Sequence, residues 1–302
     1  MPLPNATTGR WLLVLVAVLW STSGLFAKAP WLQQWPLELR GPLLAFWRTT
    51  FAGLCLLPLI RRPAWTWRLV PAALIFALMN LTFLTAMTRT TAANAIWLQN
   101  TGPMWVFLFN VVFLPNKVVR RDWIMVVLGM AGVGLILACE FQAARTTAVT
   151  PTGVLWGVAG GVTYAAVIIT VNGLRDLDSA WVMALNHLVT SALLFPFVLR
   201  QGIWPSVPQL GWLAAFGILQ MGIPYWLFAR SLRNIPSHEA ANLVLLEPIL
   251  VPIWVYLAWR HDPSYESPAG WTLVGGGLIL TGLMLRYGRP PTGRRGRHAQ
   301  RP

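Results

Sequence analysis

The chain has 302 residues, of which 56% are hydrophobic and only 11% are charged, and its formal net charge is +14. A soluble domain of this length usually has about 25% charged residues, so the charges here are too few to cover a surface that faces water. The basic residues lie between apolar runs and at the C-terminus, not on a patterned face, which excludes nucleic acid as the partner.

Ten apolar runs follow one another along the chain, and each approaches the roughly 20 residues that cross a bilayer. The gaps between them are too short for a soluble domain. The sequence therefore predicts an all-α membrane protein with ten transmembrane helices. The predicted spans are 11–29, 41–60, 69–88, 92–114, 122–139, 152–172, 180–199, 209–229, 237–259 and 269–286.

The first run has a second interpretation. Arg10, the apolar stretch and the Ala27-Lys28-Ala29 triplet resemble a secretory signal with its cleavage site. Cleavage would leave an odd number of spans and an incomplete repeat, so we favour a retained first helix.

The positive charges predict that both termini lie in the cytoplasm of a cell (inner) membrane. With a cytoplasmic N-terminus, most Lys and Arg residues fall in cytoplasmic segments, as the positive-inside rule requires. The basic tail adds to this bias and is expected to contact anionic lipids. The exceptions are Arg48, within a span, and the outer residues Lys28, Arg40, Arg89, Arg145, Arg200 and Arg260.

The two halves of the chain resemble each other. Ala95, Leu98 and Pro103 recur 145 positions later as Ala240, Leu243 and Pro248. Trp20 and Tyr164 also occupy similar places, as do Arg48 and His187. Because five spans are an odd number, the second half would enter the membrane from the opposite side, an arrangement that suits alternating access. The predicted organisation is a cytoplasmic N-terminus 1–10, a first five-helix repeat 11–139, an outer linker 140–151, a second repeat 152–286 and a basic cytoplasmic tail 287–302.

Several of these segments resemble one known family. Thr91 to Leu98 followed by Pro103, Leu246-Glu247-Pro248, and the glycine-rich runs 129–135 and 275–280 are similar to the fourth, ninth, fifth and tenth helices of the EamA-type drug/metabolite transporters. The resemblance spans about 11–286. It implies a 5+5 helix fold and transport, often export, of amino acids or other small metabolites, commonly driven by ion gradients. Many members have Glu just after the fourth and ninth helices, where this chain has Asn116-Lys117 and Arg260-His261-Asp262.

Three ionisable residues are candidates for proton or charge handling, because a charge within a span is costly unless it is paired or faces water. Glu247 either loads and releases a proton, or is structural and paired with Arg48 or with backbone freed by Pro248. Arg48 either binds a substrate carboxylate, pairs with Glu247 or snorkels to the outer surface. Glu239 beside His238 either relays protons or forms a solvated helix start.

Neutral polar and aromatic residues are candidates for lining a substrate cavity. Asn94, Trp97 and Thr101 share one helix face by their spacing. For each candidate, hydrogen bonding or packing between helices is the alternative. Pro103 and Pro248 are expected to act as paired hinges near this cavity, or as passive kinks. The predicted lining is Trp20, Asn80, Asn94, Trp97, Asn100, Thr101, Tyr164, Gln220, Tyr225 and Asn242.

No sequence pattern of a metal site, a phosphate loop or a nucleophile elbow occurs, so no cofactor, metal or catalytic residue is expected. We favour a secondary transporter of small metabolites such as amino acids, with export as the direction and protons as the candidate coupling ion. The alternatives are an intramembrane enzyme or lipid-handling protein, for which only His187 and Glu247 qualify, and a non-transporting scaffold that uses its basic tail.

Overall fold

The computed structural model describes residues 6–113, 119–144, 151–231 and 243–288. These residues form helices and connecting turns, and no strand occurs among them. Seven helical segments are long and apolar enough to cross a membrane, and α13 (Leu246–Trp259) is a shorter apolar helix. The all-α membrane fold is therefore confirmed, while the count of ten spans stays a prediction.

The helices follow the predicted runs closely in both halves. The first half contains α1 (Ala6–Ser21), α2 (Ser23–Ala27), α3 (Leu37–Leu56), α4 (Leu69–Arg89), α5 (Ala92–Gln99), α6 (Gly102–Phe113) and α7 (Arg120–Ala144). The second half contains α8 (Thr152–Asn172), α9 (Ser179–Gln201), α10 (Val207–Gly217), α11 (Ile223–Ser231), α13 and α14 (Gly270–Tyr287). A π-helical turn, Ile218–Gly222, joins α10 to α11.

Local signals in the sequence set several helix boundaries. Thr91 begins α5 by accepting a hydrogen bond from the backbone N–H of Asn94, and Ser206 with Gln209 forms a capping box at the start of α10. Gly202 ends α9 in the left-handed conformation, at a φ of 63°, which glycine adopts without steric cost. These caps satisfy backbone groups that a helix end leaves unpaired.

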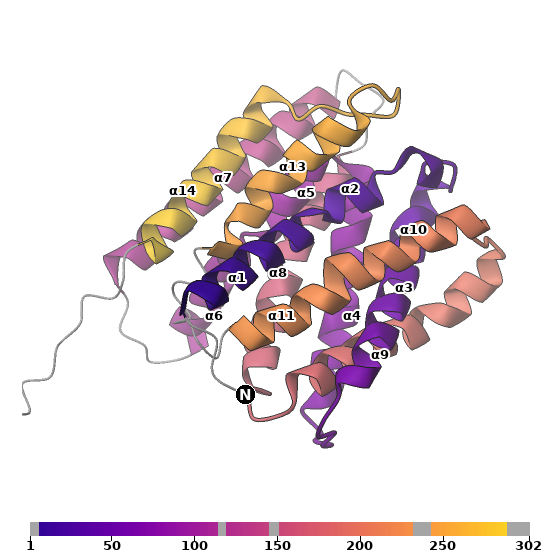
Figure 1. The fold of residues 1–302 in the computed structure, drawn as a ribbon. Coiled ribbons are helices and arrows are strands. Elements are labelled where there is room, and N and C mark those ends of the chain that lie inside the picture. Colours follow the sequence, from indigo (N-terminus) through magenta and orange to yellow (C-terminus); the bar gives the residue numbers. More distant parts are fainter. Residues whose placement is uncertain (1–5, 114–118, 145–150, 232–242, 289–302) are drawn as a thin grey trace, which may run out of the picture.

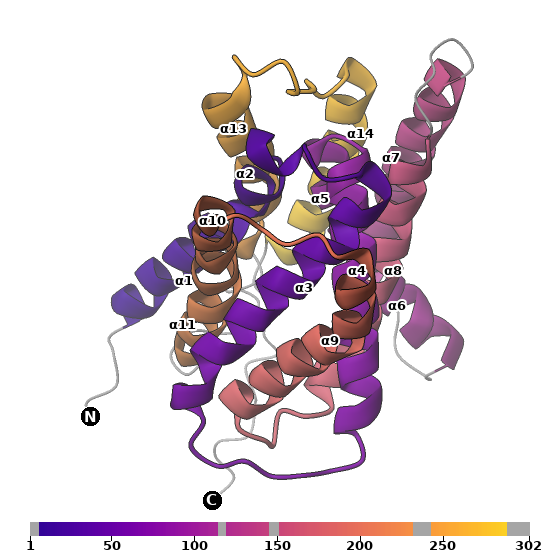
Figure 2. The ribbon, with the colours of Figure 1, turned by 90° about the vertical axis from the view of Figure 1, so that its right-hand side faces the viewer.

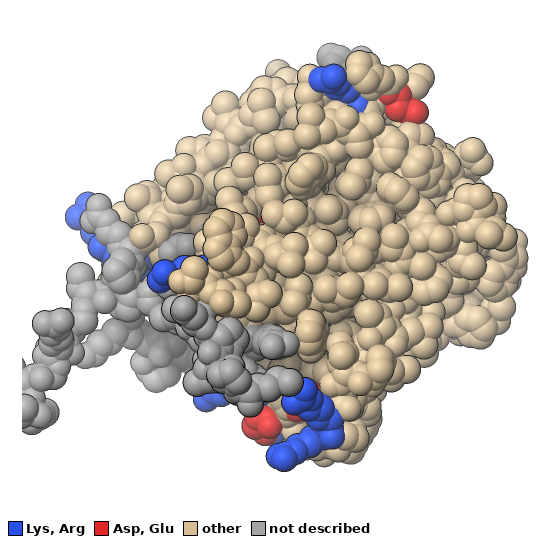
Figure 3. Space-filling view, viewed as in Figure 1, with Lys and Arg blue, Asp and Glu red and all other residues tan. Residues whose placement is uncertain are grey.

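The bundle has two distinct ends (Figure 1). The loops 28–36 and 260–269 lie at one end, here called the upper end, and the loops 60–68 and 173–178 lie at the other, the lower end. Charged side chains gather at these two ends and leave a wide uncharged belt between them (Figure 3). Such a belt fits the hydrocarbon core of a bilayer, in which charged side chains are costly.

The contacts between helices repeat across the two halves. α3 packs against α9, and α7 packs against α14, so helices at equivalent places in the two halves pair with each other. The contact of α4 with α8 has its counterpart in the contact of α11 with α1. A pseudo-twofold axis that passes between α3 and α9 and between α7 and α14 produces this pattern. Figure 2 shows the same bundle from the side, with α6 leaning away from its neighbours at the lower end.

Glycines allow α7 and α14 to approach each other closely beside this axis. A Cβ at Gly132 of α7 would collide with the carbonyl oxygen of Gly275 of α14, and one at Gly275 would lie 2.8 Å from the carbonyl oxygen of Gly132. The same two helices are joined at the lower end by an ion pair between Asp122 and Arg286. The α7–α14 pair is therefore fixed by backbone contact as well as by charge.

A second clamp ties the loops of the two halves together at the lower end. The carboxylate of Asp178 accepts hydrogen bonds from the backbone N–H groups of Arg61 (2.8 Å) and Arg62 (3.0 Å) and from that of Ala180 (2.9 Å). Partial burial by itself raises the pKa of Asp178, but the backbone donors, which include Trp181, outweigh it and hold the pKa below its ordinary value.

Candidate functional site

Two helices are interrupted at equivalent places near the middle of the bundle. The fourth predicted span breaks at Asn100 and Thr101, between α5 and α6, and the ninth breaks at Leu245, directly before α13. Pro103 and Pro248 each lie in the first turn of the helix that follows, where a proline has no hydrogen bond to remove. The interruption thus precedes each proline, instead of lying within a continuous helix as expected from the sequence.

The polar ends of three further side chains have no partner among the described residues. Glu247 lies in the first turn of α13, Tyr164 lies on α8 and Tyr225 lies on α11. All three residues are partly accessible. No described residue forms a hydrogen bond or an ion pair with the Glu247 carboxylate or with either hydroxyl group. Interior polar groups are normally paired, so these three groups are candidates for contact with water or a ligand.

Aromatic rings complete this site. The ring of Trp20, from α1, lies edge-on to Tyr225 with 5.4 Å between centroids, and its Nε1 has no hydrogen-bond partner among the described residues. Tyr164 and Tyr225 both pack against one buried apolar cluster that includes Phe76 and Met221. We call Trp20, Tyr164, Tyr225 and Glu247 the central cluster. Its members come from four helices, α1, α8, α11 and α13, and therefore from both halves.

Arg48 lies next to the central cluster and is itself buried. Its side chain is only 1% exposed. One terminal nitrogen donates to the side-chain oxygen of Asn80, and the other donates to that of Gln220 at 3.3 Å. Its guanidinium also lies over the rings of Phe83 and Phe216, at 5.8 and 5.2 Å from their centroids.

These contacts decide among the roles expected for Arg48. The side chain does not snorkel, and no ion pair joins it to Glu247 in the described part of the chain. Asn80, Gln220 and Arg48 instead connect α4, the π-helical turn and α3, and Gln220 continues the network by donating to the carbonyl oxygen of Trp20 at 3.2 Å. The side-chain amides of Asn80 and Gln220 thus accept hydrogen bonds from Arg48 instead of lining open space.

His187 and its neighbour Asn186 are fully buried on α9, and no polar atom of either side chain has a partner. The His187 ring lies edge-on to Phe76, with 4.8 Å between centroids. Because the ring is not accessible, it offers no group to a substrate. The enzyme alternative therefore keeps only one accessible candidate, Glu247.

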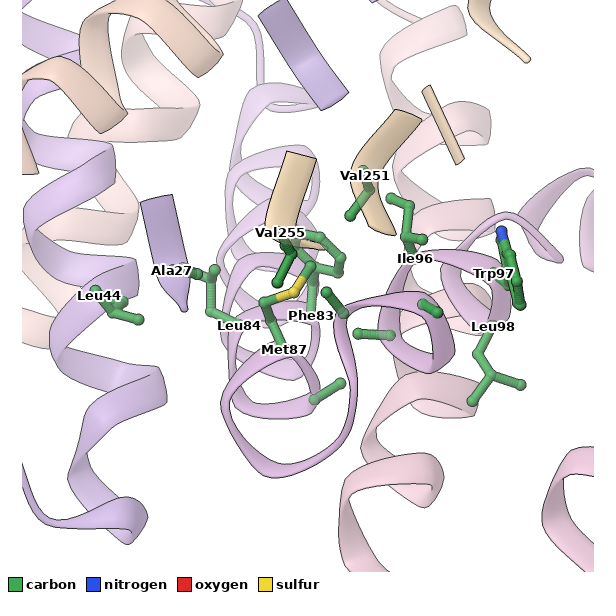
Figure 4. Close-up of a cluster of buried hydrophobic side chains, with 14 of the residues drawn as sticks. Ala27, Leu44, Phe83, Leu84, Met87, Ile96, Trp97, Leu98, Val251 and Val255 are labelled. Atoms are coloured by element: carbon green, nitrogen blue, oxygen red, sulfur yellow. The ribbon is translucent and has the colours of Figure 1, made fainter. Parts of the chain in front are cut away.

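Apolar side chains are closely packed toward the upper end of the bundle (Figure 4). Apolar side chains from α2, α4, α5 and α13 pack together there (Figure 4). All eight residues of α5 are buried, whereas only Gly102 and Met104 are buried in α6. We call this packing the upper seal; it comprises Ala27, Leu84, Met87, Ile96, Val251 and Val255, each at most 5% exposed.

A hydrogen bond beside the upper seal joins α5 of one half to α13 of the other. Trp97 of α5 donates its Nε1–H to the carbonyl oxygen of Pro248 in α13, at 2.8 Å. That carbonyl has no donor within its own helix, because the residue four positions later is Pro252 and carries no N–H. Gly276 of α14 leaves room for the indole, since a Cβ there would collide with it.

The other predicted lining residues form local or helix–helix contacts. Asn94 is buried and donates to Thr90 and to Glu140, both at 3.0 Å. Asn100 donates to the carbonyl oxygen of Ile96, and Thr101 donates to that of Leu98. Glu239 and Asn242 lie outside the described residues.

Sequence reasoning missed three contributors to this region. Phe83 and Phe216 were not distinguishable from other apolar residues of their spans. Pro252 did carry a signal, because a proline four positions after Pro248 frees a carbonyl that a donor must satisfy.

The comparisons with known proteins agree with a two-fold internal repeat. The family model of the EamA-like transporter family matches residues 7–138 and again residues 151–287. A relative in Archaeoglobus fulgidus named as an uncharacterized transporter is 25% identical over 92% of this chain and 96% of its own length. A relative in Rhizobium johnstonii named as a riboflavin transporter is 24% identical over 80% of this chain and 79% of its own. One crystal structure shares the fold, with a TM-score of 0.61 and 19% identity over 93% of this chain and 98% of that one.

Proposed function

Because the chain belongs to the EamA-like transporter family, we propose that it is a secondary transporter that moves small organic molecules by alternating access around the central cluster. The observation that carries this proposal is the set of accessible interior groups without partners, Glu247, Tyr164 and Tyr225, at the level where two helices are interrupted. A site built from both halves changes its access when the halves move relative to each other.

In this proposal the described conformation is closed at the upper end. The upper seal separates the central cluster from that end, so the substrate reaches the cluster from the lower end. Transport then requires the contacts of α5 with α13 and of α2 with α13 to open. A hydrophobic seal is suited to this change because apolar packing has no fixed bonding geometry.

The distribution of positive charge supports cytoplasmic termini in the inner membrane, which makes the lower end cytoplasmic and the conformation inward-facing. We further propose export as the direction and protons as the coupling ion. An accessible carboxylate without a partner, that of Glu247, is a group able to take up and release a proton.

Flux into and out of proteoliposomes tests the transport proposal. The purified protein would be reconstituted and offered a panel of amino acids, amines and other metabolites, with and without a pH gradient. Flavins belong in the panel because one relative is named a riboflavin transporter. We expect saturable flux of at least one compound; no flux of any compound would count against transport. Gradient-driven flux that is unchanged in Glu247→Gln would count against proton coupling alone.

A further inference from the structure

The two loops of the lower end are fastened to each other by hydrogen bonds to the backbone. The Asp178 carboxylate accepts from the backbone N–H groups of Arg61 and Arg62. Three residues further along α9, the Trp181 indole donates to the carbonyl oxygen of Ala64 at 2.8 Å. These bonds hold the backbone of the loop that joins α3 to α4, although this loop contains no helix.

The same contacts occupy both acidic groups of the two loops. One carboxylate is taken up by backbone N–H groups, as described above, and that of Asp176 forms an ion pair with Arg68 at 3.1 Å. Arg61, Arg62 and Arg175 are exposed, and no group in the described part of the chain pairs with their guanidinium groups. The loops therefore carry unneutralised positive charge on a fixed backbone, and basic side chains are visible at this end of the bundle (Figure 3).

Two indoles of the same loop are also largely exposed, Trp65 at 70% and Trp67 at 75%. From Trp67 the exposed apolar residues continue along α4 as Val70, Leu74 and Leu78, each 49% exposed. Their helical spacing places them on one face of α4. Because α4 is long and apolar enough to span a membrane, this face is suited to contact with acyl chains. Trp67 lies at its lower end, at the level where indoles are favoured in a bilayer.

We propose that the two lower loops bind the headgroup of an anionic phospholipid, with an acyl chain along the exposed face of α4. The free guanidinium groups suit the phosphate, since arginine can donate two parallel hydrogen bonds to its oxygens. The indoles, each with an apolar body and a polar N–H, suit the glycerol region between headgroup and chains. A soluble anion would use the guanidinium groups alone and leave the apolar face uncovered. We call Arg61, Arg62, Trp65, Trp67 and Arg175 the lower lipid surface. It shares no residue with the central cluster, so lipid binding can be measured separately from transport.

Native mass spectrometry of the purified, delipidated full-length protein tests this surface. Phosphatidylglycerol and phosphatidylcholine with identical acyl chains would be titrated separately, and glycerol 3-phosphate would provide a phosphate headgroup without chains. We expect phosphatidylglycerol to bind at least about fivefold more tightly than phosphatidylcholine. Glycerol 3-phosphate should bind at least about tenfold more weakly than phosphatidylglycerol, because it has no chain to place on the apolar face.

Two double variants locate the effect. Arg61→Gln with Arg62→Gln keeps the backbone N–H groups that Asp178 binds, and it should weaken phosphatidylglycerol binding about fivefold for each arginine removed. Arg200→Gln with Arg260→Gln is the matched control, because it removes the same charge from exposed positions at the far ends of α9 and α13, and it should bind lipid like wild type. The basic tail is present in every variant, so the comparison isolates the loops. Circular dichroism and size-exclusion profiles equal to wild type would show that both variants are folded.

Equal binding of the two lipids by the wild-type protein would overturn the proposal. Unchanged phosphatidylglycerol binding in the loop variant, or an equal loss in the loop and control variants, would also overturn it. Glycerol 3-phosphate that binds as tightly as phosphatidylglycerol would identify a site for soluble anions instead of a lipid surface.

Discussion

Replacing Trp97 by Phe removes the described hydrogen bond that joins α5 to α13 across the two halves. The Pro248 carbonyl would then have no donor, since Pro252 provides no N–H. An unpaired buried carbonyl costs about 1–3 kcal/mol. If this cost falls mainly on the closed conformation, the population open at the upper end rises about 5- to 150-fold.

Cysteine labelling measures this change. Val251 is fully buried in the upper seal, so Val251→Cys, with Cys55 and Cys139 replaced by Ala, should react slowly with a membrane-impermeant maleimide. We expect Trp97→Phe to accelerate labelling from the upper side. Trp105→Phe is the control, because the Trp105 indole donates within its own helix region, to Thr101 at 3.0 Å.

A double-mutant cycle isolates the hydrogen bond from the change in packing. Pro252→Ala supplies a backbone N–H to the Pro248 carbonyl, so Trp97→Phe should accelerate labelling much less in that background. Labelling that is unchanged by Trp97→Phe, or accelerated equally in both backgrounds, would refute this account of the bond.

Three further predictions concern stability. Gly132→Ala should lower the melting temperature in detergent, because its methyl group would collide with α14. Gly134→Ala is the control, because a Cβ there would meet open space, and it should be neutral or slightly stabilising. Equal effects of the two substitutions would contradict the close contact. Arg48→Met should destabilise the protein by about 2–5 kcal/mol, measured by chemical unfolding, because two buried amides lose their donor; a stabilised variant would show that the arginine is not structural. Because the folded-state pKa of Asp178 lies below its unfolded value of about 3.9, its clamp stabilises the protein above that value and is lost as the pH falls through the lowered pKa. The backbone amides of the 57–69 segment should therefore lose protection from hydrogen exchange, corrected for intrinsic rates, in that acidic range. Asp178→Ala should cause a similar loss of protection at neutral pH. Protection that is independent of both changes would disprove the clamp.

The sequence was most informative about features that depend on solvent and on local chain geometry. Apolar runs predicted the helices because lipid requires long apolar segments. Pro103 and its counterpart Pro248 each follow an interruption of the helix, since proline favours the first turn of a helix over its interior; their role as hinges stays a prediction. Glu247, chosen on cost alone, lies in the first turn of α13 and is partly accessible; its role in proton handling stays a prediction.

The partners of polar residues could not be predicted in the same way. Arg48 bonds to Asn80 and Gln220, which are 32 and 172 positions away in sequence, and the second contact depends on a π-helical turn. Helical spacing placed Asn94, Trp97 and Thr101 on one face, but whether that face meets a cavity or another helix is decided by tertiary packing. Their burial shows that it meets other helices.

Closing the upper seal covalently tests the central claim of alternating access most directly. A Cβ at Gly24 of α2 would lie 2.7 Å from Cγ2 of Val255 in α13, so cysteines at these two positions are within disulfide reach. The pair would be introduced into a protein in which Cys55 and Cys139 are replaced by Ala, and flux would be measured in proteoliposomes before oxidation, after oxidation and after reduction. We predict that oxidation abolishes flux and that reduction restores it, while the flux of each single cysteine variant changes with neither treatment. Full flux through the oxidised, cross-linked protein would contradict the account.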